Sequence, residues 1–253
     1  MQDESTKQET STGYTIKFED YLKLSKKEKS YFGLEFCYQS NLIEGITDYY
    51  IGTLTAGEKP APKPKLFDHY SAFEYMLKNF KNNPEEEDVK DMHHILMQNI
   101  LENPKDAGKY RKCKIWVGGK GKLNYNLIPK FMESLEYDIL NLNQNGRIDY
   151  QSILNIHHKF ETIHPFVDGN GRTGRLLLNW LSLKHFKKFN VITAEKRSQY
   201  YQDIRNYEAN FRKNNLNAKF SRNRKIEPHY DLETLVLMEL LQKSQEKSIK
   251  DKY

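Results

Sequence analysis

The sequence predicts a mainly α-helical protein with one small β-hairpin. Apolar residues recur at helical spacing over most of the chain after residue 65. One segment departs from that pattern, because residues 112–121 read KCKIWVGGKG, a short strand that runs into a glycine-rich turn. No internal repeat is present. At 253 residues the chain has the length of one large domain with a small appendage.

The elements follow in chain order. Residues 1–13 are polar and lack periodicity, so we expect them to be disordered. A helix is predicted over 31–49, inside an N-terminal region that spans 14–56. Residues 57–65 read GEKPAPKPK, and their prolines predict an extended linker. In the main domain, 66–253, the spacing predicts helices over 68–81, 85–102, 127–143, 150–163, 172–186, 197–211 and 232–243.

Composition excludes several classes of protein. The first thirty residues contain no apolar segment of the secretory kind, and no stretch approaches the roughly 18 apolar residues of a membrane span. Cys37 and Cys113 are too few for a disulfide framework or a thiolate zinc site, and inert thiols are the default for both. We therefore expect a soluble cytoplasmic protein with no membrane partner.

The net charge is +6, from 40 Lys and Arg against 34 Asp and Glu. The sharpest local bias lies between Arg212 and Lys225, with six basic residues and no acid. A solvated face is the favoured interpretation of this run. Contact with nucleic acid is the minority interpretation, because aromatic residues are almost absent there.

One segment concentrates groups that can do chemistry: residues 163–175 read IHPFVDGNGRTGR. Pro165 disfavours helix at the residue before it, so one helix ends here and another begins. Gly169 and Gly171 flank Asn170, which lets successive backbone N–H groups point into one concavity. Such a nest at a helix N-terminus binds anions, above all phosphates.

The charged residues of this segment fit a phosphate site. Arg172 and Arg175 fall on one face of the first turn of the new helix, where cations oppose the helix dipole unless an anion is bound. The carboxylate of Asp168 is a hard oxygen ligand that suits Mg²⁺. His164 stands at the other end of the loop, with a side chain that can take a proton at neutral pH.

Three segments together resemble the Fic-domain family. The sequence HPFVDGNGRTGR of residues 164–175 is similar to the family signature HPFx[DE]GNGRxxR. Gly108-Lys109-Tyr110-Arg111, followed by residues 115–119, resembles the family's GxYR and "flap" hairpin, and residues 197–201, RSQYY, resemble its RxxYY stretch. The likeness covers roughly residues 40–210 and implies a Fic-type helical bundle whose hairpin is the flap.

The resemblance implies transfer of AMP from ATP to a hydroxyl of a target protein, with release of pyrophosphate. His164 would be the general base for a Tyr, Ser or Thr of the target, and Asp168 would hold Mg²⁺. Phe166 would anchor the loop in the core. The expected ATP-binding residues are Gly169, Asn170 and Gly171 at the α-phosphate, Arg172, Gly174 and Arg175 beyond it, and Tyr200 and Tyr201 near the base.

Two parts of the resemblance leave alternatives. Ile115, Trp116 and Val117 would pair with an extended segment of the target, or would simply cover the core. Tyr200 and Tyr201 are equally compatible with core positions. The family often has an asparagine seven residues after the second tyrosine, whereas this chain has Glu208 there, which leaves the further base contacts open.

A second sequence pattern suggests regulation. Residues 40–45, SNLIEG, match the [ST]xxxE[GN] inhibitory motif of regulated Fic proteins. On a helix, Ser40 and Glu44 share a face, and Gly45 follows them. The resemblance implies that Glu44 pairs with Arg175 and so removes the anchor of the γ-phosphate; an exposed helix glutamate is the plainer alternative.

Other functions remain open at this stage. Removal of AMP from a target, or transfer of another nucleotide or phosphate-linked group, needs the same phosphate nest. A nucleotide- or nucleic-acid-binding module without catalysis would tolerate loss of His164. The pairs His93-His94 and His157-His158 are predicted to be surface or helix-packing residues, because neighbours on a helix point about 100° apart. The amphipathic stretch 232–241 is predicted to cover the core, with a homodimer contact as the alternative.

Overall fold

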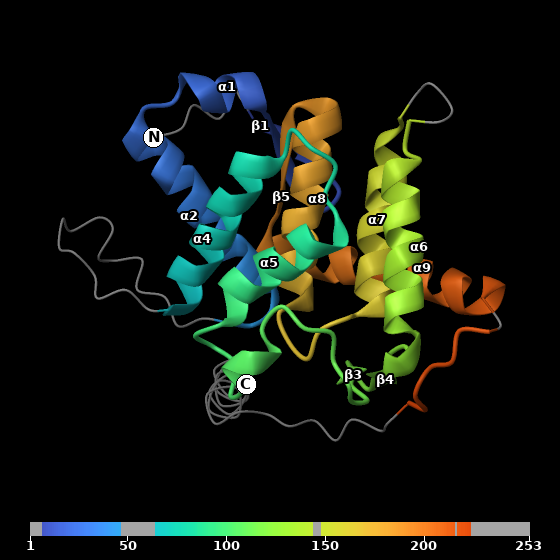
Figure 1. Ribbon diagram of the computed structural model, residues 1–253. Coiled ribbons are helices and arrows are strands. Elements are labelled where there is room, and N and C mark those ends of the chain that lie inside the picture. The colour runs from blue at the N-terminus through green and yellow to red at the C-terminus, as the bar shows by residue number, and fades with distance from the viewer. Residues whose placement is uncertain (1–6, 47–63, 144–147, 216, 224–253) are drawn as a thin grey trace, which may run out of the picture.

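The computed structural model describes residues 7–46, 64–143, 148–215 and 217–223. Helix α8 (Asn170–Phe186) runs through the centre, with α4 and α5 on one side and α6, α7 and α9 on the other (Figure 1). Its side chains are buried almost all the way round, and Trp180 is fully enclosed. A helix that is buried on nearly every face needs a shell of other elements around it. The structure therefore confirms the predicted mainly helical fold.

The helices predicted over 68–81, 85–102, 127–143, 150–163, 172–186 and 197–211 are present, with shifted ends. The boundaries moved because caps, and not apolar spacing, decide where a helix begins and ends. The remaining helices are α1 (Phe18–Lys23), α2 (Lys26–Ile43), α4 (Pro64–Asn79), α5 (Glu86–Met97), α6 (Ile128–Leu140), α7 (Tyr150–Ile163) and α9 (Arg197–Asn214), with short 3₁₀ turns at Pro104–Asp106, Tyr125–Leu127 and Ala194–Lys196.

Helix α2 starts earlier and ends earlier than the 31–49 expected from sequence. A reciprocal capping box of Ser25 and Glu28 fixes its start. Gly45, at φ 75°, ends it, because glycine adopts the left-handed conformation that follows a helix C-terminus at little cost. The buried face of α2 carries Phe32 and Phe36, which pack with rings from α4 and the strand after α8.

A three-stranded antiparallel sheet was not predicted. Strands β1 (Lys7–Thr10), β2 (Gly13–Lys17) and β5 (Lys188–Ile192) lie in the order β1-β2-β5. The expectation of disorder over residues 1–13 is therefore wrong for residues 7–13. Strand β1 is a polar edge strand that is held by backbone hydrogen bonds to β2, which leave no apolar pattern in the sequence.

The predicted hairpin is present but shorter than expected. It consists of β3 (Trp116–Val117) and β4 (Lys120–Gly121), joined through Gly118 and Gly119, which have φ values of 53° and 73°. Positive φ at both central positions is what the tight turns of hairpins require. Residues 112–115 are not part of the strand.

Two predicted segments cannot be compared. Most of the linker over 57–65 and the whole helix over 232–243 lie outside the described residues; Pro64 and Lys65 already belong to α4. Proline fits the first position of a helix because its missing N–H needs no partner there. Within the described part of the chain, no helix has both the length and the apolar character needed to cross a membrane.

Candidate active site

The loop between α7 and α8 has a residue in the left-handed backbone conformation at each end. His164 ends α7 with φ 53° and ψ 65°, and Gly169 starts α8 with φ 74°. A side chain other than glycine in this region costs of order 1 kcal/mol and persists only where its surroundings enforce it. The strained conformation of His164 marks it as a residue whose position matters.

The imidazole of His164 is set up to accept a proton. Its Nδ1 lies 3.3 Å from the carbonyl oxygen of Glu161, to which an Nδ1–H can donate. Burial, together with the nearby cations Lys122 and Arg111, holds the pKa of His164 well below its ordinary value. The ring is therefore neutral at pH 7, and its Nε2 carries the free lone pair.

Arg111 fixes this end of the loop. It is buried, and its guanidinium donates to the carbonyls of His164 (2.8 Å), Cys113 (2.7 Å) and Leu123 (2.7 Å), while its backbone N–H donates to Pro165. These bonds satisfy carbonyls at the C-terminus of α7 and tie them to the segments on both sides of the hairpin. The arginine of the GxYR pattern thus holds the loop and the hairpin in one piece.

Two further side chains fix the middle of the loop. Asn170 accepts from the backbone N–H of Phe166 at 2.8 Å and donates to its carbonyl at 2.9 Å. This amide, expected at a phosphate, is instead committed to closing the loop. His93, from α5, stacks on Phe166 with 3.7 Å between ring centroids and contacts the carbonyl of Asp168 through Nε2 at 2.9 Å. Phe166 is fully buried, as predicted.

The carboxylate of Asp168 stands at the mouth of the loop. Its side chain is 64% exposed and lies 3.6 Å from Nη2 of Arg172, which is buried. One carboxylate oxygen accepts from the backbone N–H of Gly169 at 2.6 Å. Among the residues that the structure describes, no cluster of three or more potential metal ligands exists. A magnesium ion here would need substrate phosphates as its other ligands, as is usual for Mg²⁺.

Arg175 contacts the end of α2. Its Nε donates to Ser40 Oγ at 2.8 Å, and its Nη2 donates to the Ser40 carbonyl at 2.7 Å and to Glu44 Oε1 at 2.8 Å. The guanidinium is buried, whereas the Glu44 side chain is 30% exposed. A Cβ on Gly171 would overlap the same Glu44 oxygen, so this glycine leaves the space that the carboxylate fills. Glu44 thus lies at the positive N-terminal end of α8, where an anion is stabilised.

The two tyrosines support this contact. Tyr200 is buried, accepts from Arg175 Nη1 at 3.3 Å and lies 3.0 Å from Nε2 of His157. Tyr201 donates to the carbonyl of Ile43 at 3.1 Å, next to the inhibitory motif. Both therefore act in the core between α2, α7 and α9, the alternative that the sequence left open, while their contact with a nucleotide base stays a prediction.

A cavity of about 210 Å³ collects most of the predicted residues. The loop contributes one side, the end of α2 a second and the hairpin a third. Arg175 does not line it and instead pairs with Glu44, which does. Predicted residues that are likewise not among its lining are Ser40, Gly45, Gly174, Tyr200 and Tyr201. The lining residues are Glu44, Ile115, Trp116, Val117, His164, Val167, Asp168, Gly169, Asn170, Gly171 and Arg172.

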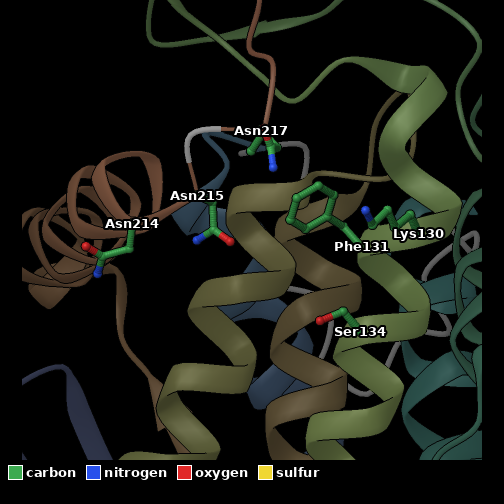
Figure 2. A pocket seen from close by; sticks show the side chains of 7 residues that line it. Lys130, Phe131, Ser134, Asn214, Asn215 and Asn217 are labelled. Carbon is green, nitrogen blue, oxygen red and sulfur yellow. The ribbon is translucent and has the colours of Figure 1, made fainter.

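A larger cavity, of about 410 Å³, lies between α6 and the end of α9 (Figure 2). Phe131 and Ser134 enter it from successive turns of α6, opposite Asn215. It contains no residue of the 164–175 loop and no histidine or carboxylate. Its polar lining, which includes Lys130, Ser134 and asparagines, can form hydrogen bonds. The smaller cavity combines a histidine, a carboxylate and an arginine and is therefore the candidate active site.

Sequence reasoning missed two buried groups around this site. His93 was predicted to be a surface or helix-packing residue; it is a packing residue, fully buried, but its contact with the loop was not foreseen. Glu161 is also buried, and a Cβ on Gly174 would overlap its Oε1, which accounts for that glycine. Burial and the neighbouring Glu44 raise the pKa of Glu161 to about 7, against the opposing effect of Arg175 and Lys122.

Residues 83–182, which include α5, the hairpin, α7 and the loop to α8, match the model of the Fic/DOC family. This part of the chain is therefore similar to Fic/DOC domains. The protein adenylyltransferase Fic of Drosophila grimshawi is 29% identical over 120 residues, 47% of this chain and 24% of that protein. The protein adenylyltransferase fic-1 of Caenorhabditis elegans is 30% identical over 119 residues, 47% of this chain and 23% of that protein.

Solved structures of Fic proteins have a similar fold. A Fic-domain-containing signaling protein from Bacteroides thetaiotaomicron superposes with a TM-score of 0.60 at 23% identity, covering 74% of this chain and 78% of that one. Fic-1 from C. elegans gives 0.61 at 18% identity, covering 76% and 62%. The chain spans about a quarter of the length of the curated adenylyltransferases that it matches.

Proposed function

We propose that this chain is a protein adenylyltransferase, which transfers AMP from ATP to a hydroxyl side chain of a target protein and releases pyrophosphate. One observation carries the proposal: a neutral, partly buried His164 shares a cavity with Asp168, Arg172 and the N-terminus of α8. A base, a carboxylate and an anion-binding helix end are what transfer of a nucleotide to a hydroxyl requires. The family match and the named relatives support the same chemistry.

In this proposal His164 Nε2 takes the proton of the target hydroxyl while the hydroxyl oxygen bonds to the α-phosphorus. The bond from that phosphorus to the bridging oxygen breaks, and pyrophosphate leaves. The backbone N–H groups at the start of α8 and the Arg172 guanidinium stabilise the negative charge on the phosphates. The protein contributes position and preorganised charge, since it forms no covalent bond with the nucleotide.

Asp168 fits a magnesium ion that is bound together with ATP. Its exposed carboxylate lies at the cavity, beside the helix end that would face the phosphates. Mg²⁺ bound through one or two carboxylates and substrate phosphates would neutralise phosphate charge during transfer. Arg172 and the loop backbone would hold the same phosphates from the protein side.

We also propose that Glu44 inhibits this reaction. Its carboxylate pairs with Arg175 and fills the space above Gly171, so it competes with phosphate both for the guanidinium and for the helix end. A hundredfold restraint on activity needs a blocked state that is favoured by about 2.7 kcal/mol. A largely buried arginine–carboxylate pair is strong enough for that, although desolvation offsets part of its gain.

The test compares label transfer from α-labelled ATP, with Mg²⁺ and cell lysate, in the wild type, in Glu44→Gly and in the double variant Glu44→Gly with His164→Ala. We expect protein-bound label to rise in Glu44→Gly and to vanish with His164→Ala, with mass spectrometry identifying added AMP. Label that persists without His164 would refute the proposed base. Absence of label in Glu44→Gly would contradict the adenylyltransferase assignment.

A further inference from the structure

The hairpin is paired with a segment from the far end of the described chain. Two-residue strands are too short to hold a hairpin in place by themselves. After α9, however, residues 217–223 return to it, and Phe220 forms an antiparallel bridge with Leu123. Backbone hydrogen bonds flank the bridge, from Ser221 N–H to the Lys122 carbonyl (3.1 Å) and from Asn124 N–H to the Lys219 carbonyl (2.7 Å).

Further contacts attach the same segment to β3 and β4 themselves. The indole Nε1 of Trp116 donates to the carbonyl of Arg222 at 2.9 Å, and the backbone N–H of Gly121 donates to Asn223 Oδ1 at 3.3 Å. A Cβ on Gly121 would overlap the carbonyl oxygen of Ser221. The close approach of the segment to β4 therefore depends on a glycine at this position.

A buried charge cluster joins the hairpin to α9. Lys122 donates to Glu208 at 2.7 Å, and both side chains are at most 5% exposed. Arg212 donates to the other oxygen of Glu208 at 2.5 Å and to the Gly121 carbonyl at 2.6 Å, and its guanidinium lies 3.7 Å from the ring centroid of Phe220. Glu208 stands where the family often has asparagine, and here each of its carboxylate oxygens has a cationic partner, Lys122 or Arg212.

We propose that residues 217–223 and the cluster of Lys122, Glu208 and Arg212 form a brace that fixes the orientation of the hairpin for docking of a protein target. This inference rests on the proposed function, because Ile115, Trp116 and Val117 line the same cavity as His164. No residue of the brace lines that cavity. The brace therefore affects docking of the target and does not change the affinity for ATP. Part of the basic run that starts at Arg212 belongs to the brace.

The test uses Gly121→Ala in the full-length Glu44→Gly protein, because the new methyl group pushes the segment off β4. Lys219→Ala is the matched control: that side chain is exposed, and only its backbone carbonyl takes part in the brace. Phe220→Ala is a second variant: it removes the ring that packs against Arg212 and Phe211, and it adds no methyl group to β4. Three readouts are taken: amide hydrogen exchange over residues 115–124, the Kd for ATP with Mg²⁺, and label transfer to lysate proteins.

We expect both brace variants to exchange amide hydrogens at 121–124 about tenfold faster or more, because local opening becomes easier. The Kd for ATP should stay within about twofold, while label transfer falls about tenfold or more, since misplacing a docked group by about 1 Å can cost about a hundredfold. Lys219→Ala should match the parent in all three readouts.

Two results would overturn the brace. One is unchanged hydrogen exchange in both variants, which would mean that the segment does not support the hairpin. The other is faster exchange with undiminished transfer, which would mean that hairpin orientation does not limit docking. If the Glu44→Gly parent transfers no label, the proposed function fails, whereas the exchange measurement still tests the brace by itself.

Discussion

Replacing Glu44 by glutamine separates two ways in which this side chain can block the site. Its carboxylate forms an ion pair with Arg175 at 2.8 Å, and it also fills the space above Gly171. Glutamine keeps the volume and one carbonyl oxygen but carries no charge. A purely steric block would therefore survive the substitution, whereas an ionic block would weaken.

The size of the effect follows from the charge that is removed. Arg175 keeps its charge, so the glutamine oxygen still accepts a charge-assisted hydrogen bond; the loss is the attraction between opposite charges, most of which desolvation of the carboxylate cancels, leaving about 1–1.5 kcal/mol. Glu44→Gln should therefore weaken the blocked state by about 1–1.5 kcal/mol, which raises the open fraction about tenfold. Glu44→Gly, which removes the side chain, should give about a hundredfold increase.

The assay is the initial rate of label incorporation from α-labelled ATP, measured side by side for the wild type and both variants. Glu35→Gln is the control, because this glutamate is exposed on the same helix and pairs only with Gln39 among the hydrogen-bond partners described for it. A Glu44→Gln variant as inactive as the wild type, beside an active Glu44→Gly variant, would refute the ionic account. Equal rates for Glu44→Gln and Glu44→Gly would refute the predicted difference of about tenfold between them.

Three more outcomes are expected. Burial lowers the pKa of His93 from 6.5 to about 4, so between these pH values the unfolded chain binds a proton that the folded chain excludes. The free energy of unfolding therefore falls as the pH drops through this range. When the pH is lowered from 7 to 4.5, His93→Gln should lose about 2 kcal/mol less of this free energy than the wild type, as measured by urea unfolding. Gly174→Ala should destabilise the protein by about 1–3 kcal/mol, seen as a lower urea midpoint, because the methyl group would overlap Glu161. Asp168→Asn in the Glu44→Gly background should remove an at least tenfold enhancement of ATP affinity by Mg²⁺ in calorimetry; an enhancement equal to the parent's would exclude Asp168 as a ligand.

The sequence was most informative where structure and chemistry are local. Residues 164–175 place the base, the glycines and the arginines within one loop and one helical turn, so their order alone predicts that they meet. The pairing of Glu44 with Arg175 spans 131 positions and came only from a matched pattern, yet the contact is present in the structure. Its inhibitory effect stays a prediction.

Contacts without a local signature could not be predicted. Strand β2 pairs with β5 across most of the chain, and nothing in the polar sequence of Lys7–Thr10 indicates a third strand. The role of His93 depends on α5 lying against the loop 75 positions later. Lys122 and Glu208 are likewise 86 positions apart, and opposite charges in a sequence rich in both do not reveal which of them pair.

If Glu44 inhibits the reaction as proposed, the sheet bears on the way in which this side chain could be withdrawn. Strand β2 leads through α1 into α2, and β5 follows α8 directly, so the amino-terminal part of α2 is attached to the same framework as the loop. Phe32 and Phe36 are almost fully enclosed, and lifting them out would expose a large aromatic surface. Unwinding only the final turn, from Ser40 onward, would expose Ile43 and break the hydrogen bonds of Ser40 and Asn41, but it would leave both phenylalanines in place. A signal of the proposed kind could therefore free Glu44 by melting about four residues, with the rest of the helix still packed.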